Sequence, residues 1–179
     1  MAEHSDLEIT LRERPAEGAL RIEYTLTNQG RHALYAFTQV LGAKYRPLPH
    51  RAYTALRERP DALHLFLGMP PIPPGVNVCV KIVPLAAYLP PGRSLTDYIE
   101  APVPVREWQP YFAPDEAGGG PVVKVEWVTL STEYFREKNA IHVRKADEYP
   151  GRYRGLLSPA WEKTQLCRHG YPRFLDEGI

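Results

Sequence analysis

Cysteine is scarce in this sequence, which contains only Cys79 and Cys167. Neither belongs to the Cys-x-x-Cys pairs that many structural zinc sites use, and two cysteines cannot form a disulfide framework. A chain of 179 residues is long enough to bury a core without such staples. Because the first residues also show no charged-then-apolar secretory pattern, we expect free thiols and a cytoplasmic protein.

Long apolar runs and a dominant charge are missing too. No apolar stretch approaches the roughly 20 residues of a membrane-spanning helix. Lys and Arg number 22 and Asp and Glu number 21, which gives a net charge of +1. Such a chain has no global field that would attract nucleic acid or an anionic membrane. We therefore expect neither a membrane nor a nucleic-acid partner.

Motifs for covalent catalysis and nucleotide binding are absent as well. No serine lies in a Gly-x-Ser-x-Gly turn, and the glycines at 118–120 are not followed by the Lys-Ser/Thr of a phosphate-binding loop. Cys79 alternates with valines, so we expect it to pack as a small apolar side chain. The sequence predicts no catalytic residue and no cofactor.

One short stretch contains metal-ligand residue types. Cys167 and His169 place a thiol and an imidazole two residues apart, the ligand types that zinc and copper prefer. Cys79, His64 or His142 would have to complete such a site. Since a single ligand pair is a weak pattern, no metal site is predicted, although sequence alone does not decide whether Cys167 and His169 bind metal.

Proline, in contrast, is abundant, with 19 residues, about twice the average share. Prolines between apolar runs disfavour long helices and suit strand ends and turns. The clearest periodicity is at 20–26, where Leu20, Ile22, Tyr24 and Leu26 alternate with polar residues. This period of two predicts a strand with one buried face. A similar run at 7–12 precedes it, so we expect the two to form a hairpin.

Further short runs predict the rest of a β fold. Turn residues such as Pro74-Gly75 and Pro91-Gly92 separate them. This frequency of strands and turns favours an immunoglobulin-like antiparallel β-sandwich. The additional strands are predicted at 33–40, 53–58, 63–67, 76–82, 95–100 and 122–130.

The pattern changes after Leu130. We expect one domain overall, with a β-sandwich core at 1–130 and a C-terminal extension at 131–179 packed on it. The extension is predicted to hold a helical turn at 133–139 and a short strand at 141–144. Ser158-Pro159 has the residues of a helix start and Gly170 could cap its end, which predicts a short helix at 159–168.

Aromatic and arginine side chains gather in two segments. The proline-rich segment 102–112 contains Trp108 and Tyr111, and aromatic residues on a rigid loop make good binding anchors. The alternative is that this segment crosses between sheets, with Trp108 and Phe112 closing the core. The C-terminal extension mixes basic and aromatic residues, a composition typical of protein interfaces. The predicted contact residues are Trp108, Tyr111, Arg152, Tyr153 and Trp161.

These observations favour a non-catalytic binding module whose partner is another protein or a second copy of the chain. The alternative is a small enzyme or ligand-binding protein with a pocket between the sheets or under the C-terminal tail. In that case Tyr98, Asp97 and His142 could supply acid–base groups. Because one fold hosts many functions, the predicted architecture does not exclude it.

Overall fold

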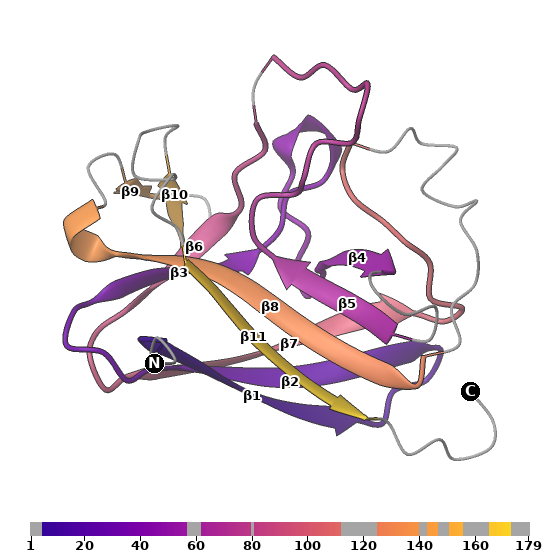
Figure 1. The fold of residues 1–179 in the computed structure, drawn as a ribbon, viewed down its shortest axis with the longest axis horizontal. Coiled ribbons are helices and arrows are strands. Elements are labelled where there is room, and N and C mark those ends of the chain that lie inside the picture. The colour runs from indigo at the N-terminus through magenta and orange to yellow at the C-terminus, as the bar shows by residue number, and fades with distance from the viewer. Residues whose placement is uncertain are drawn as a thin grey trace.

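The protein is mostly β, and its strands form two sheets (Figure 1). The computed structural model describes residues 5–56, 62–79, 81–111, 125–139, 143–146, 151–155 and 165–172. Within these ranges the helical elements are two 3-10 turns, η1 (Ala43–Tyr45) and η2 (Glu137–Asn139). None of the helical segments described has the length and apolar character that crossing a membrane requires.

The smaller sheet has three antiparallel strands in the order β1-β2-β7. They are β1 (Leu7–Arg14), β2 (Ala19–Asn28) and β7 (Ser94–Pro102). The predicted hairpin is confirmed: β1 and β2 pair from Leu7 opposite Asn28 to Arg14 opposite Arg21. Gly18 turns the chain with a φ of 67°, a conformation that glycine adopts without steric cost.

The larger sheet has eight strands in the order β4-β5-β8-β3-β6-β10-β9, with β11 paired to β8 outside this path. β11 lies along one side of β8, and β5 and β3 follow one another along the other. The β5–β8 pair is parallel, whereas the other pairs are antiparallel. The strands are β3 (Leu34–Gln39), β4 (Tyr53–Leu56), β5 (Ala62–Leu67), β6 (Leu85–Leu89), β8 (Trp127–Arg136), β9 (Val143–Lys145), β10 (Tyr153–Gly155) and β11 (Gln165–Pro172).

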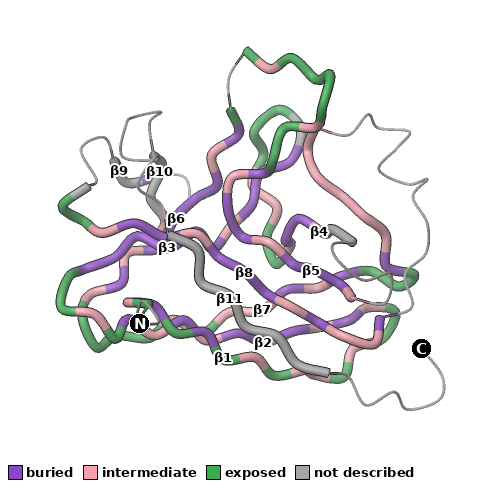
Figure 2. Tube along the Cα trace, viewed as in Figure 1, coloured by how far each residue is buried: buried purple, intermediate pink, exposed green. Residues whose placement is uncertain are grey.

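The main core lies between the two sheets. Leu20, Ile22, Tyr24 and Leu26 are all buried, as their alternation predicts, and they pack with residues of the larger sheet such as Leu65. Fully burying one such aliphatic side chain stabilises the fold by about 1.5–3 kcal/mol. Figure 2 shows buried residues along the strands of both sheets and exposed residues at most turns.

β3 is buried on both of its faces. Leu34 and Ala36 belong to the main core, while Tyr35 and Phe37 point to the opposite side and pack with Phe135 of β8. The Tyr35 and Phe135 rings are stacked, with centroids 5.3 Å apart. The larger sheet therefore has a second, aromatic cluster on the face that is turned away from the smaller sheet.

Most predicted strands are observed, but the one at 76–82 is wrong. None of its described residues lies in a strand, and both Val76 and Cys79 are exposed to solvent. β6 (Leu85–Leu89) instead pairs with β3. β6 is buried at four of its five residues, as is typical of a strand in the middle of a sheet. The polar residues that alternate along 76–82 would be buried in such a position.

The predicted C-terminal helix at 159–168 is also wrong where it can be compared. Residues 165–168 lie in β11, which pairs with β8 over its whole length, and residues 156–164 lie outside the described part. Pairing with β8 gives residues 165–168 backbone hydrogen bonds as a strand, a tertiary contact that outweighs local helix propensity. Similarly, β8 continues to Arg136, so of the predicted helical turn at 133–139 only η2 (Glu137–Asn139) is helical. β8 also runs through the predicted boundary at residue 130.

Candidate functional site

A pocket of about 150 Å³ lies between β7 of the smaller sheet and the β4–β5 end of the larger one. We call it the β7 pocket. Its apolar lining includes Leu65, Ile99, Ala101 and Val105, and Trp108 also lines it. Its charged lining residues are Arg51, Glu100 and Arg106.

Backbone pairing puts Trp108 at this pocket. Thr54 and Trp108 exchange two backbone hydrogen bonds of 2.9 Å, and the Thr54 hydroxyl donates to the Arg106 carbonyl at 2.7 Å. The segment at 105–108 therefore lies along the outer edge of β4. The Trp108 ring is 5.6 Å from that of Tyr53 and packs against the main core. Trp108 thus contributes to the core, as one alternative expected, and also lines a pocket.

The charged groups of the pocket have different partners. Glu100 forms an ion pair with Arg21 across the β2–β7 register. The Arg51 guanidinium lies over the Trp108 ring, 5.8 Å from its centroid, within the range of a cation–π contact.

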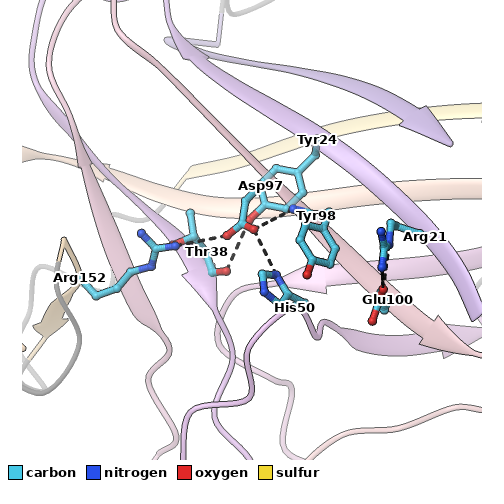
Figure 3. Close-up of polar contacts among 8 residues, drawn as sticks. All are labelled: Arg21, Tyr24, Thr38, His50, Asp97, Tyr98, Glu100 and Arg152. Carbon is cyan, nitrogen blue, oxygen red and sulfur yellow. Dashed lines mark hydrogen bonds and ion pairs between the residues drawn. The ribbon is translucent and has the colours of Figure 1, made fainter. Parts of the chain in front are cut away.

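A polar cluster surrounds Asp97, which precedes the pocket residue Ile99 by two positions on β7 (Figure 3). Asp97 falls in the alternating row of Leu95, Ile99 and Ala101, the residues of β7 that pack in or against the main core. Its carboxylate accepts the backbone N–H of Tyr98 at 2.8 Å. We call this group the Asp97 cluster.

Two basic side chains reach the Asp97 carboxylate from different parts of the chain. His50 Nδ1 lies 3.3 Å from one oxygen, and the Arg152 guanidinium lies 3.2 Å from the other. Asp97 is only 20 % exposed, as is Arg152. Burial of a carboxylate is costly unless it is paired, so these contacts account for a charge in an otherwise apolar row.

His50 closes the free edge of β7. Its carbonyl accepts the Glu100 N–H at 2.8 Å, and its ring stacks on Tyr98 with centroids 3.8 Å apart. Arg21 lies 4.8 Å from the same Tyr98 ring, and Figure 3 shows Tyr98 between His50 and Arg21. His50 adopts a φ of 56°, a left-handed conformation that costs about 1–2 kcal/mol for a non-glycine residue. These contacts offset that strain.

Tyr24 is the cross-strand neighbour of Asp97. Burial raises the pKa of the Tyr24 phenol far above its ordinary value, and the nearby Asp97 charge raises it further. Its hydroxyl lies 3.5 Å from the Thr38 carbonyl, a long hydrogen bond. The phenol therefore stays neutral and belongs to the packing of the cluster.

The His50–Asp97 contact has the geometry of half an acid–base relay. However, Arg152 shares the carboxylate, and no hydroxyl or thiol of the described residues has a recorded hydrogen bond to His50. A second pair, His64 Nε2 and Ser131 Oγ at 2.7 Å, is buried in the larger sheet, where a substrate could not reach it. Neither pair forms an accessible nucleophile with its base.

The residues predicted from sequence are distributed over several places. Trp108 lines the β7 pocket, and Arg152 belongs to the Asp97 cluster. Tyr111 accepts the Ile82 N–H at 2.9 Å through its hydroxyl and packs against a small apolar cluster. Tyr153 begins β10, where it pairs with Ala86 and Lys145. Trp161 lies outside the described residues, as do Phe112 and His142.

Asp97 and Tyr98, named for the enzyme alternative, do meet, but their partner is His50, which the sequence did not indicate. Asp97 itself had a signal: in the predicted strand at 95–100, a period of two places it on the same side as Leu95 and Ile99. No sequence pattern indicated that Arg51 would line the pocket.

No group of three or more metal-ligand side chains occurs among the described residues. Cys167 and His169 fall in β11, whose side chains lie outside the described part. Comparison with known protein families, curated proteins and solved structures finds no match to this chain.

Proposed function

We propose that this protein is a non-catalytic binding protein that recognises another protein, with the β7 pocket inside the contact surface. One observation carries the proposal: a small pocket between the two sheets whose lining combines an apolar floor with Trp108 and arginine. Tryptophan and arginine are enriched among the residues that dominate binding energy at protein interfaces. An immunoglobulin-like topology and a cytoplasmic location remain predictions from the sequence.

The composition of the pocket favours binding over catalysis. Among the described residues that line it there is no histidine, serine, cysteine or aspartate. Its carboxylate, Glu100, is paired with Arg21, and the Thr54 hydroxyl donates to a backbone carbonyl. No nucleophile in this lining therefore lies beside a base that would activate it.

A small-molecule binding protein is the second candidate, because the pocket lies between the sheets. Its volume of about 150 Å³ is below the roughly 300–1,000 Å³ of sites for drug-sized ligands. A side chain of a protein partner fits this space better, since the surrounding surfaces can supply the remaining contact area.

Filling the pocket tests the proposal. Ala101 is 2 % exposed and lines the pocket, whereas Thr96 of the same strand is exposed on the other face. Ala101→Leu should lower the binding of a protein partner that the wild-type chain retains, and Thr96→Leu should not. Partner retention is measured by quantitative affinity capture, self-association by sedimentation velocity, and folding by circular dichroism. A monodisperse monomer that retains no partner, or equal retention by the three chains, contradicts the proposal.

A further inference from the structure

We infer that the occupant of the β7 pocket is an acidic side chain, glutamate or aspartate, of the protein partner. This inference rests on the proposed function and adds the chemistry of the group that is recognised. It is argued from the charges, the donors and the dimensions of the pocket.

The charge of the pocket favours an anion. Glu100, the one carboxylate among the lining residues that the structure describes, is compensated by the Arg21 guanidinium just outside the lining. Arg51 is half-buried, and its recorded contact within the described residues is the Trp108 ring, which carries no formal charge. A carboxylate entering the pocket would therefore meet a guanidinium in a partly desolvated place, where a charge-assisted hydrogen bond is strong.

The guanidinium of Arg51 suits a carboxylate in particular. The cation–π contact with Trp108 provides no lone-pair acceptor, so it leaves the N–H donors of the Arg51 guanidinium unused. Those donors match the two oxygens of a carboxylate in a bidentate contact. The ring of Trp108 thus holds the Arg51 group while leaving its donors for a ligand.

Trp108 adds a second donor to the lining of the pocket. The Trp108 indole N–H has no recorded acceptor among the described residues, and an indole can only donate. The Thr54 hydroxyl proton is engaged by the Arg106 carbonyl. That hydroxyl therefore offers no donor to an occupant, whereas Arg51 and Trp108 do. A carboxylate accepts from both of these residues, and an ammonium, which has no acceptor, accepts from neither.

The size and the floor of the pocket distinguish an acidic side chain from an inorganic anion. At about 150 Å³ the pocket has room for roughly five water molecules at ~30 Å³ each. Ile99, Ala101 and Val105 supply apolar surface on which the methylene groups of a side chain can pack. Phosphate has no such groups and would leave this surface in contact with water.

The test is an NMR titration of the full chain with two short peptides, acetyl-Gly-Glu-Gly-amide and acetyl-Gly-Gln-Gly-amide. The peptides have nearly the same shape and differ in one charge. The signal is the indole N–H resonance of Trp108, assigned among the three tryptophans by its loss in Trp108→Phe. We expect saturable shifts with the glutamate peptide and at least tenfold weaker binding of the glutamine peptide.

The Arg51 variants decide whether this arginine is responsible. Arg51→Gln should weaken binding of the glutamate peptide about tenfold, and Arg51→Lys should fall between it and wild type, because lysine keeps the charge but lacks the planar fork. Arg93→Gln, in an exposed turn between β6 and β7, is the matched control and should bind as wild type does. Circular dichroism of each variant shows that it is folded.

Equal shifts with both peptides, or tighter binding of inorganic phosphate than of the glutamate peptide, would overturn the inference while leaving the pocket as a binding site. No shift with any probe would overturn it as well. The proposed function fails separately, if Ala101→Leu does not alter partner retention. Binding of free glutarate at the same affinity as the peptide would contradict the assignment of the acid to a protein partner.

Discussion

The carboxylate of Asp97 on β7 lies 3.2 Å from the guanidinium of Arg152, which directly precedes β10. β7 belongs to the smaller sheet and β10 to the larger one, so this ion pair joins the two sheets at one point. Each side chain is 20 % exposed. A pair at this depth is screened less than a surface pair, and loss of one member leaves the other charge uncompensated.

Replacing Asp97 should therefore destabilise the fold. Asp97→Asn keeps an acceptor for the Tyr98 N–H but removes the charge that faces Arg152 and His50, and we expect the free energy of unfolding to fall by about 2 kcal/mol. Urea denaturation measures this loss. In a double-mutant cycle, Asp97→Asn combined with Arg152→Met should cost at least ~1 kcal/mol less than the sum of the single changes.

The exposed pair Arg14–Glu23 is the control for this prediction. Its two side chains are 39 % and 35 % exposed, and removing such a pair typically changes stability by less than about 1 kcal/mol. Additive effects in the Asp97–Arg152 cycle would show that the two residues act independently and would refute the idea of a link between the sheets.

Alkaline pH should destabilise the protein through its buried tyrosines. Burial raises the pKa of both Tyr24 and Tyr53 far above their ordinary value of 10.0. Below that value both states hold the phenol protons and the contribution is fully present. Above it the unfolded chain releases them and the folded chain does not, so stability falls with rising pH, by about 1.4 kcal/mol per pH unit for each tyrosine.

Phenylalanine at either position should weaken this alkaline dependence, which denaturation curves above pH 10 would measure. The two variants should differ at neutral pH. Tyr53 donates to the Leu41 carbonyl at 3.0 Å and accepts its N–H at 3.3 Å, whereas Tyr24 has only the long contact with Thr38. Tyr53→Phe should thus cost about 1–2 kcal/mol and Tyr24→Phe less than about 1 kcal/mol. An unchanged alkaline slope in both variants contradicts the prediction.

Glu133 should be a source of instability at neutral pH. Burial raises the pKa of its carboxyl above the ordinary 4.5, although the Met69 N–H donates to it at 2.7 Å and partly opposes that shift. A raised pKa favours the folded state below 4.5, and this contribution is lost as pH rises through the folded-state pKa.

The neutral amide of Glu133→Gln keeps an acceptor for Met69 and avoids burial of the charge. We expect a gain in the free energy of unfolding at pH 7 of no more than about 1 kcal/mol, because the carboxylate is partly solvated. The gain should shrink below pH 4.5. Denaturation of both chains at the two pH values measures it, and a loss of stability at pH 7 would show that the charged form of Glu133 stabilises the native state.

Removal of β11 should expose the edge of β8. A chain that ends at residue 164 loses the pairing between β11 and β8, which runs from Gln165 opposite Tyr134 to Pro172 opposite Trp127. An unpaired strand edge promotes association with other chains. We expect lower stability and concentration-dependent aggregation, measured by light scattering. A chain that ends at residue 172 retains β11 and is the control. Equal behaviour of the two chains would mean that β11 contributes little.

Local patterns predicted the strands that have one buried face. The alternation from Leu20 to Leu26 is visible without a structure because each buried residue is apolar and each neighbour polar. β6 was not predicted, because its sequence, Leu-Ala-Ala-Tyr-Leu, contains no polar residue that alternates with the apolar ones. β3, which is buried on both faces, was predicted from the run at 33–40. The run from Val76 to Ile82 has the alternation, but none of its described residues lies in a strand.

The candidate site was predictable only in part, because its residues come from separate segments. Trp108 could be named from its unusual segment at 102–112. Its neighbour in the pocket, Arg51, is 57 positions away in the sequence, and the contact depends on the Thr54–Trp108 pairing. The contact between His50 and Asp97 also depends on the tertiary fold. The chain before β4 lies along the edge of β7, where the His50 carbonyl accepts the Glu100 N–H. No local periodicity in the sequence predicts this arrangement.

The position of β8 in the larger sheet has a consequence for biosynthesis. Its partners β3 and β5 are made before it, but β11 follows some thirty residues later. As the ribosome extends the chain, one side of β8 must stay without its ladder until residues 165–172 emerge. Slow translation or premature termination in that interval would release a nascent chain with an open strand, a natural target for chaperones.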